Sequence, residues 1–294
     1  MKKTTQNQEN RATYFHEVME KLLGHKLAIL GFCVWALEIL LVIILPFVLK
    51  LDPYTSDPAA FNGAPAAGHI LGTDSIGRDL FARLIYGGRT SLLVGVLSVM
   101  ISLVIGVPLG LAAGYYRGAI EAVIMRVADV FMSFPSIILI LVLVSVLGPS
   151  VWSVTLVIGV LGWTAFARLI YANVLSVMEK EYVESARAIG TSDFWTIVKY
   201  ILPNALPPIL ITVTFQMASA IIMESSLSFL GMGCQPPQAS WGNMLHDAQS
   251  ISILSRAPWV WLPPGIAIVI TVLSINFFGE GVRDALDPKI KVNS

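Results

Sequence analysis

Six long runs of apolar residues, separated by polar segments, dominate the chain. They cover Leu27–Leu49, Ser91–Tyr115, Val127–Leu147, Trp152–Tyr171, Ala205–Leu230 and Trp259–Phe278. Each run is near the roughly 20 residues that a helix needs to cross the apolar core of a bilayer. Backbone groups in lipid must find their hydrogen bonds within the protein, so each run is expected to be helical. The pattern predicts an all-α, polytopic membrane protein with six transmembrane helices.

The composition agrees with a membrane protein. Hydrophobic residues make up 55% and charged residues 13% of the 294 residues, whereas soluble domains carry about 25% charged residues. The net charge of zero gives no reason to expect a nucleic-acid partner. Cys33 and Cys234 lie far apart in the sequence, so no disulfide framework is expected. The polar segment 1–26 lacks a cleavage site, and the first apolar run is expected to be retained.

Lysine and arginine residues predict the orientation. If the N-terminus is cytoplasmic, 14 of the 19 Lys and Arg residues fall in inner segments and 5 in outer segments, as the positive-inside rule favours. Both termini, in segments 1–26 and 280–294, are then cytoplasmic. Segment 176–204 is also cytoplasmic, and the loop 50–90 is extracytoplasmic.

The extracytoplasmic loop 50–90 has two different halves. The first half is rich in Pro and Gly and is expected to be irregular. The second half has apolar residues at helical spacing: Ile76, Leu80 and Leu84, with Phe81 and Ile85. This spacing predicts a short amphipathic helix along the outer membrane face, with Thr73 or Asp74 as its cap.

A second outer loop, 231–258, contains Gly and Pro at a density typical of turns. Three tryptophans lie in or beside it: Trp241, Trp259 and Trp261. Tryptophan is enriched at lipid–water interfaces, so we expect these residues to be membrane anchors.

Ionisable residues inside the apolar runs are functional candidates, because buried charge is costly in a membrane. They are Glu38 in the first run, Asp129 beside its potential partner Arg126 in the third, and Glu224 in the fifth. Gln216, Ser219 and Glu224 lie broadly on one side of the fifth helix. This side is interpreted either as the wall of a translocation path or as polar contacts between helices.

No catalytic motif is present. The sequence has no G-x-x-x-x-G-K-[ST] and no Gly-Lys dipeptide, so it has no P-loop. It also lacks H-E-x-x-H and G-x-S-x-G motifs. We expect a protein that is not an enzyme and that binds no cofactor or metal of its own. An ion-driven carrier acting alone stays open, although the related halves with broken helices that are typical of such carriers are not evident.

The polar segment 176–204 interrupts the apolar pattern. It is interpreted as a short helix stopped by Gly190, then a second helix that Ser192 can cap. Tyr182, Ala186 and Ile189 recur at helical spacing, with Val183 on the same side, and predict an apolar face. A small-residue helix with an apolar face suits docking into a groove on another protein. The alternative is a plain hairpin packed on the end of the bundle.

This segment resembles the EAA motif, E-A-A-x-x-x-G-x(9)-I-x-L-P, of the inner-membrane permease subunits of ABC importers. Five residues match at the motif's spacing: Glu184, Ala186, Gly190, Leu202 and Pro203. Ser185 replaces the first alanine and Tyr200 replaces the isoleucine. Further stretches resemble the C-type permease subunit of dipeptide, oligopeptide or nickel ABC importers. They are 71–79, 125–129, 226–231, 235–237, 241–242 and 281–288.

The resemblance implies a type I ABC importer permease fold with its core at 91–279, in a bacterial inner or plasma membrane. It implies a heterodimer with a second permease subunit, two ATP-binding subunits that hold ATP and Mg, and an extracytoplasmic substrate-binding protein. The residues implied to couple the bundle to the ATPases are Glu184, Ser185, Ala186, Ala188, Gly190, Leu202 and Pro203. Peptides are the implied cargo, with nickel or a metal chelate as the alternative.

Overall fold

The computed structural model describes residues 18–286, and within that range the chain is built almost entirely of helices. The long helices are α2 (Lys26–Val48), α3 (Leu80–Tyr116), α4 (Gly118–Met132), α5 (Ser136–Leu147), α6 (Val151–Met178), α9 (Leu202–Phe229) and α12 (Pro258–Leu286). Five spans are uninterrupted, and the bent pair α4–α5 gives a sixth if it is counted as one. The expected all-α membrane fold is confirmed. The sequence-based assignments on residues 1–17 and 287–294 lie outside the described residues.

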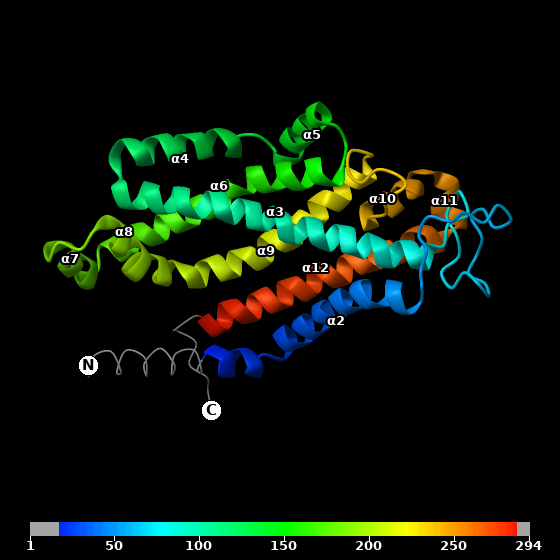
Figure 1. The fold of residues 1–294 in the computed structure, drawn as a ribbon, viewed down its shortest axis with the longest axis horizontal. Coiled ribbons are helices and arrows are strands. Elements are labelled where there is room, and N and C mark those ends of the chain that lie inside the picture. Colours follow the sequence, from blue (N-terminus) through cyan, green and yellow to red (C-terminus); the bar gives the residue numbers. More distant parts are fainter. Residues whose placement is uncertain (1–17, 287–294) are drawn as a thin grey trace.

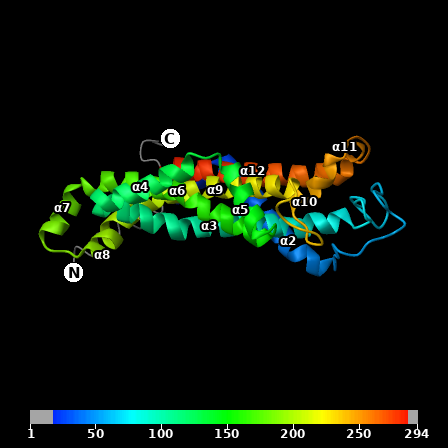
Figure 2. The same cartoon turned by 90° about the horizontal axis from the view of Figure 1, so that it is seen from above.

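Short helices lie at the two ends of this elongated bundle (Figures 1 and 2). One end carries α7 (Glu181–Ala188) and α8 (Asp193–Thr196), and the other carries α10 (Trp241–His246), α11 (Ile251–Arg256) and the loop 49–79. The start of α2 and the end of α12 both lie toward the α7 end (Figure 1). These two helix ends are joined there by His25 and Asp284, whose side chains approach to 3.4 Å.

Among the described helices, α3 and α6 share the most extensive contact. A β-carbon added to Gly106 would lie 2.5 Å from the carbonyl oxygen of Trp163, and one added to Gly110 would lie 2.6 Å from that of Ala167. Small residues at a spacing of four let two membrane helices approach closely. The Ser102 hydroxyl adds a hydrogen bond to the Gly159 carbonyl at 2.8 Å. Dispersion and hydrogen bonding therefore hold this helix pair together, because the hydrophobic effect contributes little to association between helices inside a lipid bilayer.

The third apolar run is broken in its middle. It was predicted to cross as one helix, but α4 and α5 meet at an angle of 90° around residues 133–135. Pro135 is the cause, because proline disfavours helical geometry at the residue before it and has no N–H to donate. The Pro135 backbone is extended at φ −59° and ψ 121°, immediately before α5 begins.

The separate amphipathic helix predicted within 71–88 is wrong. The residues from Leu80 onward are helical, but they form the first turns of α3, which continues without interruption to Tyr116. Ile76 lies before the helix in a turn. The cap is Asp79, whose carboxylate accepts the backbone N–H of Ala82 at 2.7 Å, and neither Thr73 nor Asp74 caps it.

Asp74 instead organises a buried ionic cluster at the α10 end. Its carboxylate accepts hydrogen bonds from the backbone N–H and the Nε of Arg78, at 2.9 and 2.7 Å. Arg83, 2% exposed, lies 3.4 Å from the same carboxylate and donates to Asn243 of α10 at 3.1 Å. Burial, reinforced by the nearby Asp74 charge, raises the pKa of the Asp247 carboxyl. The cluster thus ties the outer loop, α3 and α10 together.

Trp241 is part of the same end and is not a membrane anchor. It was expected at the lipid–water interface, but it is only 3% exposed. Its indole N–H donates to the Leu84 carbonyl at 3.0 Å. The neighbouring Gly242 packs directly on the backbone of Ser225 in α9. The second outer loop is therefore inserted into the bundle through α10, which turn-rich composition alone did not indicate.

Removing the Asp74 carboxylate should destabilise the protein strongly. Asp74→Ala leaves Arg83 buried without its counter-charge, and breaking a buried ion pair costs about 3–5 kcal/mol. We expect the thermal unfolding midpoint, measured by tryptophan fluorescence of the purified protein in detergent, to fall by roughly 10 °C. Asp52→Ala is the control, because Asp52 accepts the Tyr54 N–H at 2.8 Å on an exposed surface. An equal loss in both variants would contradict a special role for the buried cluster.

Candidate coupling surface and translocation cavity

The short helix α7 has well-formed ends. Glu181 and Glu184 lie in its first turn, where negative charge is favourable toward the helix dipole. At the other end, Thr191 N–H donates to the Ala186 carbonyl at 3.1 Å and Gly190 N–H to that of Arg187 at 3.0 Å. This pair of bonds is a Schellman motif, and it places Gly190 in the left-handed region with φ 82°. The predicted glycine stop is confirmed.

The buried side of α7 differs in part from the predicted apolar face. Ala186 is buried as expected, and Val183 beside it is completely inaccessible. Tyr182 is 44% exposed, and Ile189 follows the end of the helix and is 82% exposed. The predicted spacing assumed that the helix continued through Ile189, whereas the glycine stop ends it at Ala188. Among the EAA-like positions, Glu184, Ser185 and Ala188 are exposed.

Two contacts attach α7 and α8 to α3. The Tyr115 hydroxyl donates to the Asp193 carboxylate at 2.6 Å. The Arg187 guanidinium lies 5.3 Å from the centre of the Tyr115 ring, within the range of a cation–π interaction. Ser192 occupies the cap position of α8, but its side chain makes no capping hydrogen bond, contrary to expectation. Tyr115 thus anchors both short helices to the bundle.

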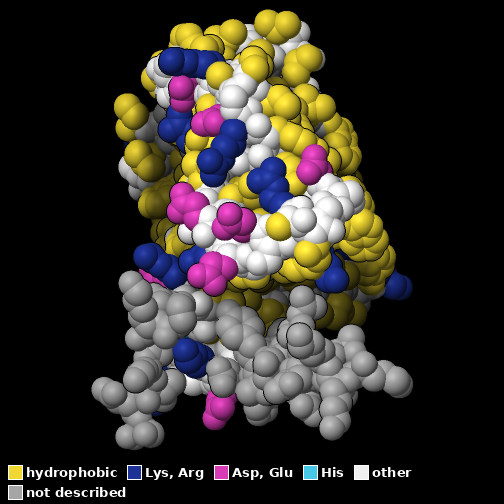
Figure 3. All heavy atoms as spheres, turned by 90° about the vertical axis from the view of Figure 1, so that its left-hand side faces the viewer, with side chains coloured by type: hydrophobic (Ala, Val, Ile, Leu, Met, Phe, Trp, Pro, Cys, Tyr) yellow, Lys and Arg dark blue, Asp and Glu magenta, His cyan; other side chains and the backbone are white. Residues whose placement is uncertain are grey.

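The outward side of this end carries exposed apolar side chains. Phe194 and Trp195 are 69% and 60% exposed, and they lie near Ile189 in the sequence. This end of the molecule shows acidic and basic side chains among apolar ones (Figure 3). An exposed apolar group framed by charge is typical of a surface that meets another protein.

A π-helical turn, Ile197–Ile201, connects α8 to α9 without a break in the helical path. The Leu202 N–H donates to the Ile197 carbonyl, five residues back. Pro203 follows immediately and has no N–H to donate, so the regular i to i−4 hydrogen-bond pattern of an α-helix cannot be completed there. The wider π-helical turn lies directly before this position. Leu202 and Pro203 therefore begin α9 rather than belonging to the exposed α7 surface.

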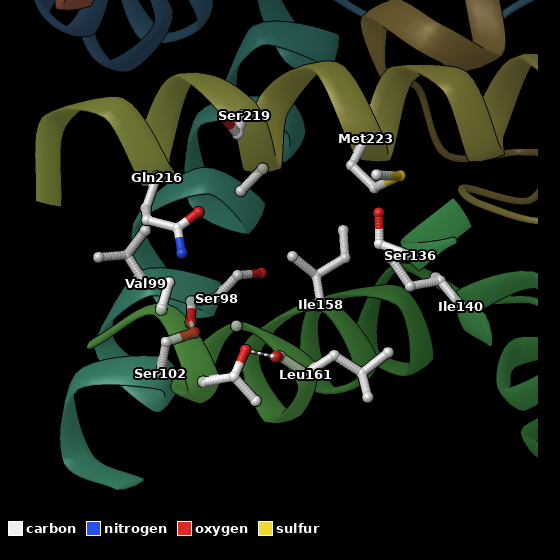
Figure 4. A pocket seen from close by; sticks show the side chains of 14 residues that line it. Ser98, Val99, Ser102, Ser136, Ile140, Ile158, Leu161, Gln216, Ser219 and Met223 are labelled. Atoms are coloured by element: carbon white, nitrogen blue, oxygen red, sulfur yellow. Dashed lines mark hydrogen bonds between the residues drawn. The ribbon is translucent and has the colours of Figure 1, made fainter. Parts of the chain in front are cut away.

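A cavity of about 240 Å³ lies between α3, α5, α6 and α9 (Figure 4). Its polar wall consists of hydroxyl groups and one amide: Ser98 and Ser102 of α3, Ser136 of α5, Thr164 of α6, and Gln216 and Ser219 of α9. Two of the three predicted path residues, Gln216 and Ser219, thus line it. The hydroxyl residues from the other helices were not identified from the sequence, where the only signal was Ser and Thr inside apolar runs.

Glu224, the third predicted path residue, is not in the cavity wall. It is 1% exposed and lies toward the α10 end of α9. The Ser91 hydroxyl donates to its carboxylate at 2.9 Å and the Ser228 hydroxyl at 2.7 Å. Ser91 also accepts the backbone N–H of Trp241 at 3.3 Å. Glu224 therefore joins α3, α9 and α10, which corresponds to the alternative of polar contacts between helices.

The other intramembrane acidic residues are also paired. Glu38 accepts a hydrogen bond at 2.8 Å from the hydroxyl of Thr271 in α12. Asp129 forms its ion pair with Arg168 of α6, not with Arg126 on its own helix as expected. The contact with α6 was not predictable from spacing, because it depends on how α4 packs beside that helix.

Comparison with known proteins identifies two family models in the chain. Residues 106–292 match the binding-protein-dependent transport system inner membrane component. Residues 13–65 match the N-terminal transmembrane domain of oligopeptide transport permease C. The two matches lie in the same order as the predicted first span and permease core.

Two named relatives align with the chain over most of their length. The chain is 38% identical to the dipeptide transport system permease protein DppC of Alkalihalophilus pseudofirmus, covering 97% of this chain and 93% of that protein. It is 41% identical to the glutathione transport system permease protein GsiD of Pectobacterium atrosepticum, covering 87% of this chain and 86% of that protein.

Among solved structures, an inward-facing MetNI methionine ABC transporter aligns with a TM-score of 0.58 at 20% identity, over 69% of this chain and 96% of that chain. This likeness concerns the fold, which is that of a type I ABC importer permease. The family match over most of the bundle and the identity with these relatives show that the chain belongs to the binding-protein-dependent transport system inner membrane components.

Proposed function

We propose that the chain is the permease subunit of an ATP-driven importer that moves peptides delivered by an extracytoplasmic binding protein. The family match supports the transport role. The names of the relatives, a dipeptide and a glutathione permease, support a peptide cargo. The observation that carries the proposal is the pairing of an exposed docking helix at one end with a hydroxyl-lined cavity in the same bundle.

The α7–α8 end is the proposed contact with one of two ATP-binding subunits. ATP and Mg bind to those subunits, and this chain contributes no catalytic group. Exposed Ile189, Phe194 and Trp195 provide apolar area for docking. The Schellman motif and the Tyr115 contacts hold the surface rigid, so that docking on it can move the bundle as a body. A second permease subunit completes the path, and membrane lipid surrounds the rest.

The orientation follows from the same assignment. If α7 faces the ATP-binding subunits, the α7 end is cytoplasmic and the α10 end is extracytoplasmic. The start of α2 and the end of α12 lie toward the α7 end (Figure 1), which supports a cytoplasmic location for both ends of the helical bundle's chain. This agrees with the distribution of Lys and Arg. The binding protein then approaches the end that carries α10, α11 and the loop 49–79.

The cavity suits peptides better than a bare nickel ion. Its lining contains no His, Cys, Asp or Glu residue, the side chains that bind transition metals. Hydroxyl groups and the Gln216 amide can both donate and accept hydrogen bonds, as peptide groups require. Uptake of labelled peptide and of labelled nickel chelate into vesicles, with the partner subunits, ATP and the binding protein present, tests the choice. Uptake of only the nickel chelate would overturn the peptide proposal.

Gly190→Asp should abolish transport. It adds a β-carbon to a backbone at φ 82°, where a side chain costs roughly 1–3 kcal/mol, and a negative charge beside the docking surface. We expect peptide uptake to be lost and the ATP-binding subunits to separate from the permease during co-purification.

Gly68→Asp is the matched control for this variant. Gly68 also has a left-handed backbone, with φ 103°, and like Gly190 it has no neighbouring atom within 4 Å of an added β-carbon. It lies in the loop 49–79, at the opposite end of the bundle from α7. Its variant should keep the ATP-binding subunits attached. Normal peptide uptake and normal co-purification of the ATP-binding subunits in Gly190→Asp would contradict a coupling role for α7.

Ser219→Trp should block the path. The indole would occupy much of a cavity of about 240 Å³, so we expect peptide uptake to fall at least roughly tenfold, about 1.4 kcal/mol, while the ATP-binding subunits stay attached. Ile222→Trp is the control, because Ile222 is on the same helix, is 47% exposed and does not line the cavity. Unchanged uptake in Ser219→Trp would place the path elsewhere.

A further inference from the structure

An apolar groove of about 360 Å³ runs between α2 and α3, away from the cavity described above. Its wall is formed by side chains such as Trp35, Ile39, Val42, Leu92, Leu93 and Val96. Arg89 is the single charged residue in this wall. A groove of this composition between two membrane spans has the chemistry of an acyl-chain site.

Arg89 is fixed in place by the backbone of α2. Its Nε donates to the Val42 carbonyl, which is free because Pro46, four residues later, has no N–H. Its Nη2 donates to the Ile43 carbonyl at 2.8 Å. The rings of Phe47 and Tyr86 lie 5.3 and 5.1 Å from the guanidinium carbon. The guanidinium is thus preorganised at the edge of the groove.

Among the described residues, the Arg89 charge has no acidic partner. Within residues 18–286, no Asp or Glu carboxylate oxygen lies within 4.0 Å of its guanidinium nitrogens, in contrast to Arg78, Arg83 and Arg168. Carbonyl oxygens and aromatic rings stabilise the cation but do not neutralise it. A guanidinium with unused N–H donors is well matched to a phosphate group, which it can bind in bidentate geometry.

A second pocket, of about 220 Å³, adjoins the groove and shares Arg89 and Leu93 with it. Its remaining wall is more polar and includes Tyr54, Thr90 and Gln238. Trp152 also lines it and is 66% exposed. Tyrosine and tryptophan side chains are typical of the level at which lipid headgroups lie.

We propose that the groove and the second pocket together form a binding site for one anionic phospholipid. An acyl chain lies in the groove between α2 and α3, the phosphate binds Arg89, and the rest of the headgroup enters the pocket beside Tyr54 and Gln238. The apolar groove alone would accept any lipid, or a helix of a second permease subunit. The unneutralised Arg89 between an apolar and a polar pocket selects the anionic phospholipid.

The experiment uses the complete transporter with its partner subunits, in nanodiscs of phosphatidylglycerol mixed with phosphatidylcholine. Native mass spectrometry after detergent release measures the lipid that stays bound. A photoreactive residue at Val96 identifies by cross-linking what occupies the groove. We expect retained phosphatidylglycerol and a lipid cross-link in the wild type. One arginine near the membrane surface contributes about a fivefold preference for anionic lipid. Arg89→Gln should therefore lower the preference for retained phosphatidylglycerol about fivefold.

Two further variants make the result specific. Arg256→Gln removes an exposed arginine of α11 at the same end and should keep the preference. Leu93→Trp fills both pockets, leaves Arg89 in place and should also abolish retention. The proposal is overturned by equal retention of the two lipids in the wild type, by full retention in Leu93→Trp, or by equal losses in Arg89→Gln and Arg256→Gln. A Val96 cross-link to the second permease in place of lipid overturns it as well.

Discussion

The close approach of α3 and α6 is the contact on which the rest of the bundle depends. Gly106 and Gly110 bring the two backbones together, and serine hydroxyls of α3 donate to carbonyls of α6. In lipid, packing and hydrogen bonds of this kind replace the hydrophobic effect as the force between helices. Because α9 lies beside this pair, the cavity forms where the serines of α3 face Gln216 and Ser219. A fixed α3–α6 pair therefore gives the cavity two walls with a defined position.

At the α10 end, buried carboxylates fix the relative positions of neighbouring segments. Asp74 satisfies the N–H groups of a tight turn and neutralises arginines, while Glu224 accepts two serine hydroxyls. A buried polar group is costly unless its hydrogen bonds are complete, so each carboxylate specifies one arrangement of its neighbours. Ser91 links Glu224 to the backbone of Trp241, which extends this order into α10. Of the two interpretations that the sequence left open for Glu224, a path residue or a polar contact between helices, the structure shows the second, and Glu224 holds α10 in the bundle.

The sequence was sufficient for the helical class, the approximate spans and the glycine stop of α7, because hydropathy and the Schellman motif are local properties. It was insufficient wherever the outcome depends on a neighbouring helix. The rotation of α9 decides that Ser219 faces the cavity while Glu224 faces α3. The burial of Trp241 depends on small residues of other helices, which composition does not reveal. Pro135 indicates a possible bend in the third apolar run, but the run was predicted as one straight helix because its hydropathy is high on both sides of the proline.

The connections of α7 explain how one small surface can act on the whole cavity. On one side, only residues 179 and 180 separate it from α6, and on the other the path through α8 and the π-helical turn continues into α9. Both α6 and α9 contribute walls to the cavity. A displacement of α7 is therefore delivered to two walls of the cavity, and a further wall, α3, is tied to the same end through Tyr115. Since packed helices move as rigid units rather than deform continuously, such an arrangement favours a shift of the bundle between discrete states over a local adjustment at the docking site.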